Sequence, residues 1–142
     1  MSTSKKTERA RAGYSGKPLY QKLDLSPGLR AYGHNLPAHY FDWLELPAAR
    51  ALFSPRLGSD LRFIHAFIER AKGHEAALER LAAALHPQGC LWISWLKGGK
   101  TDFGEHEVRA WALAHSLVDV KVCAVSEGWS GLKCVRRKAA AE

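Results

Sequence analysis

The chain has 142 residues, of which 46% are hydrophobic and 25% charged, values ordinary for one soluble globular domain. No apolar run approaches the roughly 18 residues of a transmembrane helix, and the opening MSTSKKTERARAG lacks the apolar core of a secretory signal. We therefore expect a cytoplasmic protein without a membrane partner. We expect a disordered basic tail at 1–12, a single α/β domain at 13–137 and a disordered tail at 138–142.

The net charge of +7 is concentrated at the two ends of the chain. Residues 1–11 hold four basic side chains and one acidic one, and residues 136–142 hold three basic and one acidic. The stretch between them has fourteen basic and twelve acidic side chains, so it is nearly balanced. This distribution predicts weak, salt-sensitive contacts of the tails with anionic polymers. It does not predict a surface that binds nucleic acid specifically.

The first half of the chain predicts short elements. Pro18 suits the first turn of a helix, and Leu19 and Leu23 share one helical face. The expected elements are a helix at 17–25, a strand within 29–35, a helix from Pro37 and a short strand at 51–53. The course of residues 45–60 is left open.

The second half predicts longer elements in alternation. The run LRFIHAFI is typical of a strand buried on both faces, and Leu78, Leu81 and Leu85 recur at helical spacing. Asp102 with Glu105 predicts a capping box at the next helix. The expected elements are a strand at 61–68, a helix stopped by Pro87 and Gly89, a strand at 90–96, a helix within 101–117, and two strands at 118–125 and 132–137, the first half-buried and alternating.

Strand–helix alternation that ends in a hairpin predicts a three-layer α/β fold. The early strands should be parallel, because helices connect them, and they should form a mostly parallel sheet flanked by helices. The last two strands should form an antiparallel C-terminal hairpin.

The closing stretch CAVSEGWSGLKCVRRK raises the possibility of a cysteine site. A turn centred between Gly128 and Trp129 would place Cys123 opposite Cys134, on one face of the hairpin. The two thiols would then be a redox pair, half of a metal site, or two small buried side chains. We favour buried thiols, because the chain has no C-x-x-C pair and no His/Cys cluster near these residues. Trp129 would be either part of the core or an exposed binding anchor.

Three stretches resemble a known family. GYSGKPLYQKL, KTDFGEHEVR and LVDVKVCAVSEGWSGLKCVRR are similar to the landmarks of a family of short bacterial proteins known as a domain of unknown function. The resemblance is close over 90–142, clear over 13–30 and weak over 31–89. The family has a proline after the strand tryptophan and a longer loop there, whereas here Leu96 follows Trp95 and the loop is the short KGGK.

That family in turn resembles a reduced version of the S-adenosylmethionine-dependent methyltransferase fold. The resemblance implies a methyltransferase-like topology, although fold does not imply function. Nucleoside sites of this type use a glycine-rich turn after the first strand and an acidic residue after the second. Here the turn holds Gly33 alone, and the candidate second strand ends in Ser54-Pro55. A divergent or degenerate methyltransferase is therefore an alternative interpretation, and we expect no cofactor.

Other catalytic or metal-binding patterns are weak. The loop KGGK lacks phosphate-loop spacing, the seven histidines are dispersed without an H-E-x-x-H motif, and EGWSG is not a nucleophile elbow. We expect no metal site and no catalytic residue.

In open α/β sheets, ligands bind beyond the carboxyl ends of the parallel strands. Applied here, this rule gives a candidate site of strand-end and loop residues: Tyr14, Ser15, Gly16, Gly33, His34, Asn35, Glu69, Arg70, Lys97, Lys100, Trp129 and Ser130. The first hypothesis is a small, non-catalytic domain that binds a small anionic molecule or a protein partner. The alternatives are the divergent methyltransferase and a nucleic-acid accessory factor acting through its tails.

Overall fold

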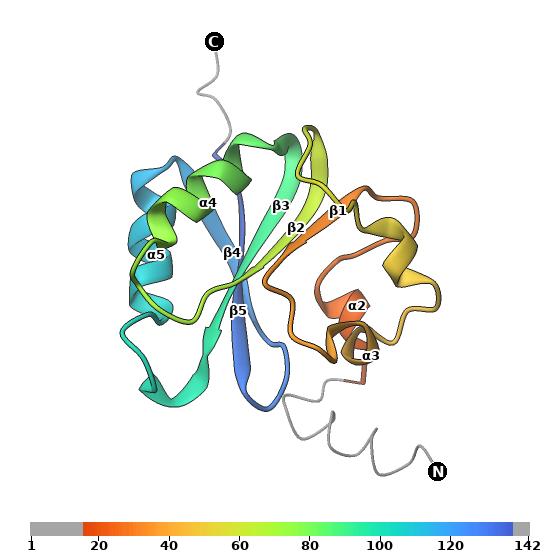
Figure 1. The fold of residues 1–142 in the computed structure, drawn as a ribbon, viewed down its shortest axis with the longest axis horizontal. Helices are drawn as coiled ribbons and strands as arrows, with labels where there is room; N and C mark the ends of the chain where they lie inside the picture. Colours follow the sequence, from red (N-terminus) through yellow and green to blue (C-terminus); the bar gives the residue numbers. More distant parts are fainter. Residues whose placement is uncertain (1–15, 138–142) are drawn as a thin grey trace.

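The computed structural model describes residues 16–137, which form a five-stranded sheet (Figure 1). The strands are β1 (Ala31–His34), β2 (Leu61–Phe67), β3 (Leu85–Leu96), β4 (Leu117–Ala124) and β5 (Trp129–Arg136). They are arranged in the order β1-β2-β3-β5-β4. β1, β2 and β3 are parallel, and β5 is antiparallel to both β3 and β4. The C-terminal hairpin therefore supplies the one strand that runs in the opposite direction.

Helices cover both faces of this sheet (Figure 1). The helices α4 (His74–Ala83) and α5 (Glu105–Ala114) lie on one face, called here the α4/α5 face. The short helices α2 (Leu19–Lys22) and α3 (Tyr40–Leu44) and the 3₁₀ helix η1 (Ala49–Leu52) lie on the other, the α2/α3 face. The predicted three-layer α/β fold, with its mostly parallel sheet and antiparallel C-terminal hairpin, is confirmed.

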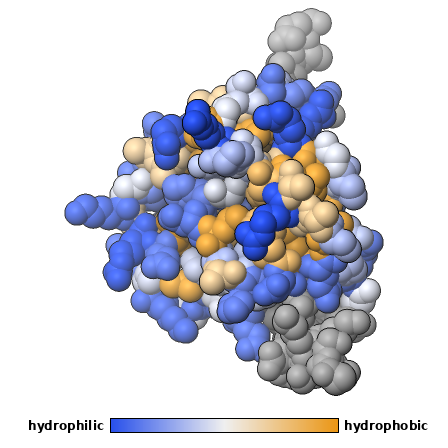
Figure 2. Space-filling model, turned by 45° about the vertical axis from the view of Figure 1, so that its right-hand side comes forward, coloured by the Kyte–Doolittle hydropathy of each residue, from blue (hydrophilic) through white to orange (hydrophobic). Residues whose placement is uncertain are grey.

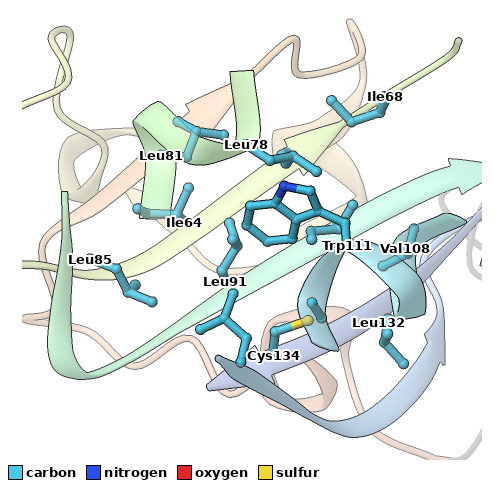
Figure 3. Packing of buried hydrophobic residues seen from close by; sticks show 14 of the residues in the cluster. Ile64, Ile68, Leu78, Leu81, Leu85, Leu91, Val108, Trp111, Leu132 and Cys134 are labelled. Carbon is cyan, nitrogen blue, oxygen red and sulfur yellow. The ribbon is translucent and has the colours of Figure 1, made fainter. Parts of the chain in front are cut away.

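The α4/α5 face is packed mainly with aliphatic side chains (Figure 3). Leu78 and Leu81 of α4, with Val108, Trp111 and Ala112 of α5, are buried against the central strands. Their spacing of three or four residues gives each helix one apolar stripe, and that stripe is the face the sheet covers.

The α2/α3 face combines aliphatic side chains with four large buried aromatic ones. Tyr40, Phe63, Phe67 and Trp92 are all fully buried or nearly so. Figure 2 turns this side of the molecule towards the reader and shows apolar side chains between polar ones. The core on this face thus reaches the surface at its margin, because its covering helices are short.

The sheet holds the four-residue helix α2 in place. Trp92 Nε1 donates a 2.9 Å hydrogen bond to the carbonyl of Leu23, directly after α2. The next residue, Asp24, is paired with Lys133 at 2.7 Å and Lys121 at 3.0 Å, both from the C-terminal hairpin. A helix this short is marginal by itself, so these tertiary contacts stabilise it.

Two predictions for the first half of the chain are wrong in extent or type. The helix predicted at 17–25 is only α2, because Asp24 adopts a left-handed backbone conformation with φ of 61°. The strand predicted at 51–53 is largely η1, whose backbone groups are satisfied by local i→i+3 hydrogen bonds. Only Phe53 pairs with the sheet, through an isolated bridge to Ala31. The strand within 29–35 is confirmed as β1. The helix predicted from Pro37 is present as α3, but it begins only at Tyr40.

The boundary between α4 and β3 also differs from the prediction. Pro87 and Gly89 do not end the helix; it stops at Ala83, and β3 already begins at Leu85. The β2–β3 register shifts in this stretch, so both residues lie in an irregular part of the strand. A Cβ on Gly89 would lie 2.8 Å from the Leu61 carbonyl oxygen, so this close approach of two strands requires glycine.

The helix α5 begins later than predicted. The residue that precedes it is Gly104, whose N–H donates a 2.9 Å hydrogen bond to Oε1 of Glu107. The predicted capping box of Asp102 with Glu105 is therefore wrong. The carboxylate of Asp102 instead accepts a 2.8 Å hydrogen bond from the N–H of Ala71, and so connects the loops before α4 and α5.

The predicted pairing of the two hairpin cysteines is also wrong. Cys123 lies opposite Gly131, and Cys134 lies opposite Asp119. This offset places the two side chains in cores on opposite faces of the sheet, because neighbouring strand positions point to opposite sides. All three cysteines are free and buried, as expected. Burial raises the pKa of the Cys134 thiol to about 12, which disfavours its nucleophilic thiolate form.

Strand β4 forms an edge of the sheet, and four consecutive residues at its centre are exposed. The predicted half-buried alternation is wrong, because the register shifts between Asp119 and Lys121 and because, among residues 16–137, no strand lies beyond β4 in the sheet.

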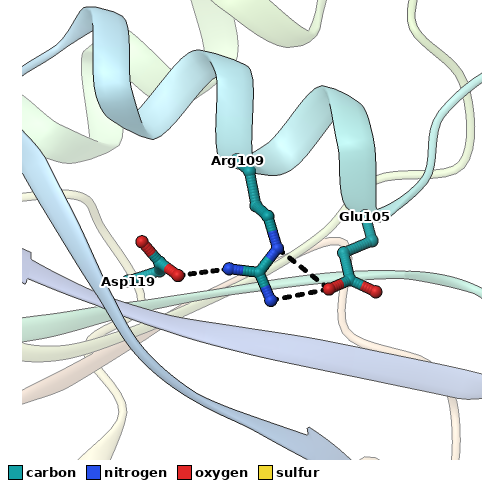
Figure 4. A network of polar contacts seen from close by, with 3 residues as sticks. All are labelled: Glu105, Arg109 and Asp119. Carbon is teal, nitrogen blue, oxygen red and sulfur yellow. Dashed lines mark hydrogen bonds and ion pairs between the residues drawn. The ribbon is translucent and has the colours of Figure 1, made fainter.

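Arg109 of α5 donates a hydrogen bond from Nε to Glu105 at 2.9 Å and also pairs with Asp119 (Figure 4). This surface network fixes α5 over β4 but contributes at most about 1 kcal/mol.

No helix in the described part of the chain is long and apolar enough to cross a membrane. The tails predicted at 1–12 and 138–142 lie outside the described residues.

Candidate functional site

A pocket of about 370 Å³ opens at the carboxyl ends of β1 and β2. It lies between these strand ends, the first turn of α4 and the start of β5. Its lining residues are His34, Asn35, Phe67, Ile68, Glu69, Arg70, Lys72, Gly73, His74, Ala77 and Trp129. This is the edge at which open α/β sheets bind ligands.

One wall of the pocket is polar and contains several basic groups. Arg70 and Lys72 are exposed in the loop between β2 and α4, beside the single acidic side chain of Glu69. The loop leads into α4 through Gly73, which offers no side chain to cap the helix. The partial positive charge at the start of α4 therefore adds to that of the two basic side chains, although Glu75 in the first turn of the helix offsets part of it.

His34 contributes a half-buried imidazole to the same wall. Burial, together with repulsion from Arg80, lowers the pKa of His34 below its ordinary value. Its Nε2 lies 3.3 Å from Nδ2 of Asn35, which adopts a left-handed backbone with φ of 56°. A neutral imidazole has one donor and one acceptor nitrogen, so His34 can hydrogen-bond a ligand without adding a positive charge to the pocket.

The opposite wall is aromatic. Phe67, at the end of β2, meets Trp129 edge to face, with ring centroids 4.9 Å apart and planes at 84°. The Phe67 ring also stacks on the imidazole of His65, with ring centroids 4.3 Å apart. His65 in turn is hydrogen-bonded to the hydroxyls of Tyr40 at 2.9 Å and Ser94 at 2.7 Å. The wall is therefore fixed by a buried network that joins α3, β2 and β3.

The structure brings some of the predicted site residues together. His34, Asn35, Glu69, Arg70 and Trp129 all line the pocket. Trp129 was predicted to be either a core residue or a binding anchor; it is half-buried, and it both packs on Phe67 and faces the pocket.

Other predicted site residues lie elsewhere. The pocket lining does not include Gly16, Gly33, Lys97, Lys100 or Ser130. The backbone N–H of Lys97 donates to Gly128, so the KGGK loop is fastened to the hairpin turn. Tyr14 and Ser15 lie outside the described residues.

Sequence analysis missed several lining residues, namely Phe67, Ile68, Lys72, Gly73, His74 and Ala77. Phe67 and Ile68 belong to an apolar run that predicts only a core strand. Lys72 could have been predicted from the sequence, because it stands two positions after Arg70 in the same loop.

Metal ligation is not favoured by the geometry. Among residues 16–137, no three His, Cys, Asp or Glu side chains are close enough to hold an ion together. Burial also raises the pKa of the Cys90 thiol to about 11, which disfavours the thiolate form that binds metals.

Comparisons with known proteins relate the chain to others by structure. No family model matches it, and no curated protein matches it in sequence. A protein described as a type 11 methyltransferase from Sulfolobus solfataricus superimposes with a TM-score of 0.57 at 10% identity, covering 87% of this chain and 92% of that one. A TehB-like SAM-dependent methyltransferase from Corynebacterium glutamicum gives 0.53 at 12% identity, covering 95% and 96%.

A third solved structure is that of the 1,6-didemethyltoxoflavin-N1-methyltransferase of Burkholderia thailandensis, with bound 1,6-didemethyltoxoflavin and S-adenosylhomocysteine. It superimposes with a TM-score of 0.52 at 15% identity, covering 96% of this chain and 82% of that one. At such low identity these likenesses establish the fold, which is that of methyltransferases, and not the activity.

The fold raises the question of whether this chain can hold S-adenosylmethionine. A glycine after the first strand serves such ligands by letting them approach the bare backbone. Here Gly33 lies within β1 and not after it, and the space beside it is filled, since a Cβ built on Gly33 would lie 2.4 Å from the Leu36 side chain. Among residues 16–137 no strand lies beyond β1 to carry an acidic partner for ribose. The residues after β1 therefore do not fit this cofactor.

Proposed function

We propose that the chain is a methyltransferase-fold domain that binds a small anionic molecule in the pocket at the ends of β1 and β2, and that it does so without catalysis. The observation that carries the proposal is the basic wall, where Arg70 and Lys72 precede the uncapped start of α4. Arg70, Lys72 and the helix terminus contribute positive charge to one opening, and Glu69 is the single acidic side chain in the lining.

The size of the pocket limits the ligand. Ligand pockets span about 300–1,000 Å³, and a pocket of about 370 Å³ is near the lower end of that range. It suits a metabolite-sized molecule rather than a segment of polymer. Because Arg70 and Lys72 are exposed, their attraction to an anion is screened by salt, and the affinity should fall as ionic strength rises.

Ligand-dependent stabilisation tests this proposal. Thermal unfolding is followed with inorganic phosphate and with pyrophosphate, against sodium chloride of equal ionic strength. A ligand at 100 times its dissociation constant should stabilise the fold by about 2.7 kcal/mol. We expect stabilisation in the wild type and its loss in the double variant Arg70→Gln/Lys72→Gln.

The matched control is Arg62→Gln. It removes an exposed arginine near the start of β2, at the end of that strand away from the pocket. This variant should keep the wild-type response to both anions. Stabilisation that is absent from the wild type, or that persists in the double variant, refutes an anion site at this wall.

A divergent S-adenosylmethionine-dependent methyltransferase is the second candidate, and the structural neighbours support it. The filled space at Gly33 opposes it. Calorimetric titration with S-adenosylmethionine and S-adenosylhomocysteine separates the two candidates. If the chain is a non-catalytic anion-binding domain, the titration should show no binding heat above dilution at millimolar cofactor. Saturable binding of either compound would favour the methyltransferase.

A further inference from the structure

We infer that the ligand of this pocket joins its anionic group to a flat aromatic ring. The inference rests on the proposed function and specifies the class of molecule. It comes from the division of the pocket into two chemically different walls, a basic wall around Arg70 and Lys72 and an aromatic wall of Phe67 and Trp129.

The two walls belong to opposite faces of the sheet. Phe67 and Trp129 belong to the α2/α3 core, whereas Ile68, the next residue along the chain, belongs to the α4/α5 core. The pocket therefore straddles the end of β2, with α4 on one side and the aromatic pair on the other. A ligand that contacts both walls must carry its charge at one end and its ring at the other.

The aromatic wall is held rigidly. Phe67 packs against both Trp129 and His65, and hydrogen bonds to buried Tyr40 and Ser94 fix the imidazole of His65. Since these rings are already immobilised before a ligand arrives, little conformational entropy is lost on binding. A flat ring placed against Trp129 should gain affinity over a puckered ring of similar size. Aromatic pairing of this kind corresponds to about a two- to tenfold change in dissociation constant.

The volume is consistent with one small ring system. A pocket of about 370 Å³ has room for a ring that carries a phosphate or a carboxylate. The polar side chains of His34 and Asn35 also line the pocket, where they can hydrogen-bond ring substituents.

The test compares phenyl phosphate with cyclohexyl phosphate, two anions of equal charge and similar size that differ in the flatness of the ring. Dissociation constants are measured by calorimetric titration of the full chain. We expect phenyl phosphate to bind two- to tenfold more tightly. The variant Trp129→Leu should remove this preference, and Trp129→Phe should keep most of it. Unfolding of each variant without ligand checks that the fold is retained.

The outcomes separate this inference from the proposed function. If both phosphates bind equally well to the wild type, or if Trp129→Leu keeps the preference, the aromatic inference fails and the anion site stands. If neither phosphate binds and inorganic phosphate also fails to stabilise the fold, both proposals fail. A preference for phenyl phosphate that depends on the ring at position 129 supports both.

Discussion

The side chain of His65 is fully buried at the centre of β2, between the hydroxyls of Tyr40 and Ser94. Each hydroxyl can donate or accept, so a neutral imidazole satisfies both contacts with one donor and one acceptor nitrogen. A protonated imidazole would place a charge in the aromatic core without a counter-ion. Burial accordingly lowers the pKa of His65 to about 3, from an ordinary value of 6.5.

This depressed pKa predicts how stability depends on pH. Below pH 6.5 the unfolded chain gains a proton at His65 that the folded chain does not accept until about pH 3. The contribution of His65 to the free energy of unfolding is therefore complete above pH 6.5. It falls between pH 6.5 and 3, with a slope of up to about 1.4 kcal/mol per pH unit. Urea unfolding at several pH values measures this slope, which should be smaller in His65→Gln.

A control variant and a second measurement accompany this prediction. His106→Gln, at an exposed position of α5, controls for the change of residue type. Should His65→Gln fail to fold, NMR of the wild-type imidazole replaces it: a His65 ring that becomes protonated above pH 5 contradicts the prediction.

Among the elements, the end of α4 depends on a strand far away in the sequence. Nη2 of Arg136, on β5, donates to the carbonyl of Ala82 at 2.5 Å and lies 3.4 Å from that of Leu85. The last carbonyls of a helix have no partners within the helix, and a cation there also meets the negative end of the helix dipole. Strand β5 of the C-terminal hairpin thus both pairs with β3 in the sheet and caps the end of α4.

Replacing Arg136 tests this capping role. Arg136→Gln should lower the free energy of unfolding by about 1.5–3 kcal/mol, the range for hydrogen bonds made by charged groups. The neighbouring Arg137→Gln, at an exposed position, should change it by less than about 0.5 kcal/mol. Chemical denaturation of both variants gives the comparison, and equal effects would contradict the capping role.

At the scale of the whole molecule, one sheet separates two cores. Leu91 on β3 is buried in the α4/α5 core, whereas its neighbour Trp92 is buried in the α2/α3 core. Because the same strands form the floor of both cores, neither core can lose its packing without exposing the other. The described residues should therefore unfold as one cooperative unit.

Large-to-small variants on each face test this cooperativity. Leu91→Ala, on the α4/α5 face, and Phe63→Ala, on the α2/α3 face, should each cost about 2–5 kcal/mol. In both variants, tryptophan fluorescence and far-ultraviolet circular dichroism should report one midpoint of unfolding. Two separate midpoints in either variant would show that the faces unfold independently.

The sequence predicted only part of the pocket lining, because it shows where strands end but not which strand ends lie beside the pocket. The strand-end rule identified His34, Asn35 and Arg70, because the carboxyl ends of β1 and β2 must meet at one edge. It also selected Lys97 and Lys100, which follow β3 but do not line the pocket. Sequence alone does not show which strand ends are covered, and here the hairpin turn holds the loop after β3.

The sequence by itself determined the order of strands and helices in the second half and the buried faces of α4 and α5. Those features follow from local apolar periodicity, which records burial directly. Only the tertiary structure decided the hairpin register, the exposed position of β4 and the two-walled pocket. A register shift beside Val120 leaves no periodic trace, yet it places Cys123 and Cys134 on opposite faces. The pocket likewise joins residues from β1, β2, α4 and β5, and their convergence depends on strand order rather than on any local pattern.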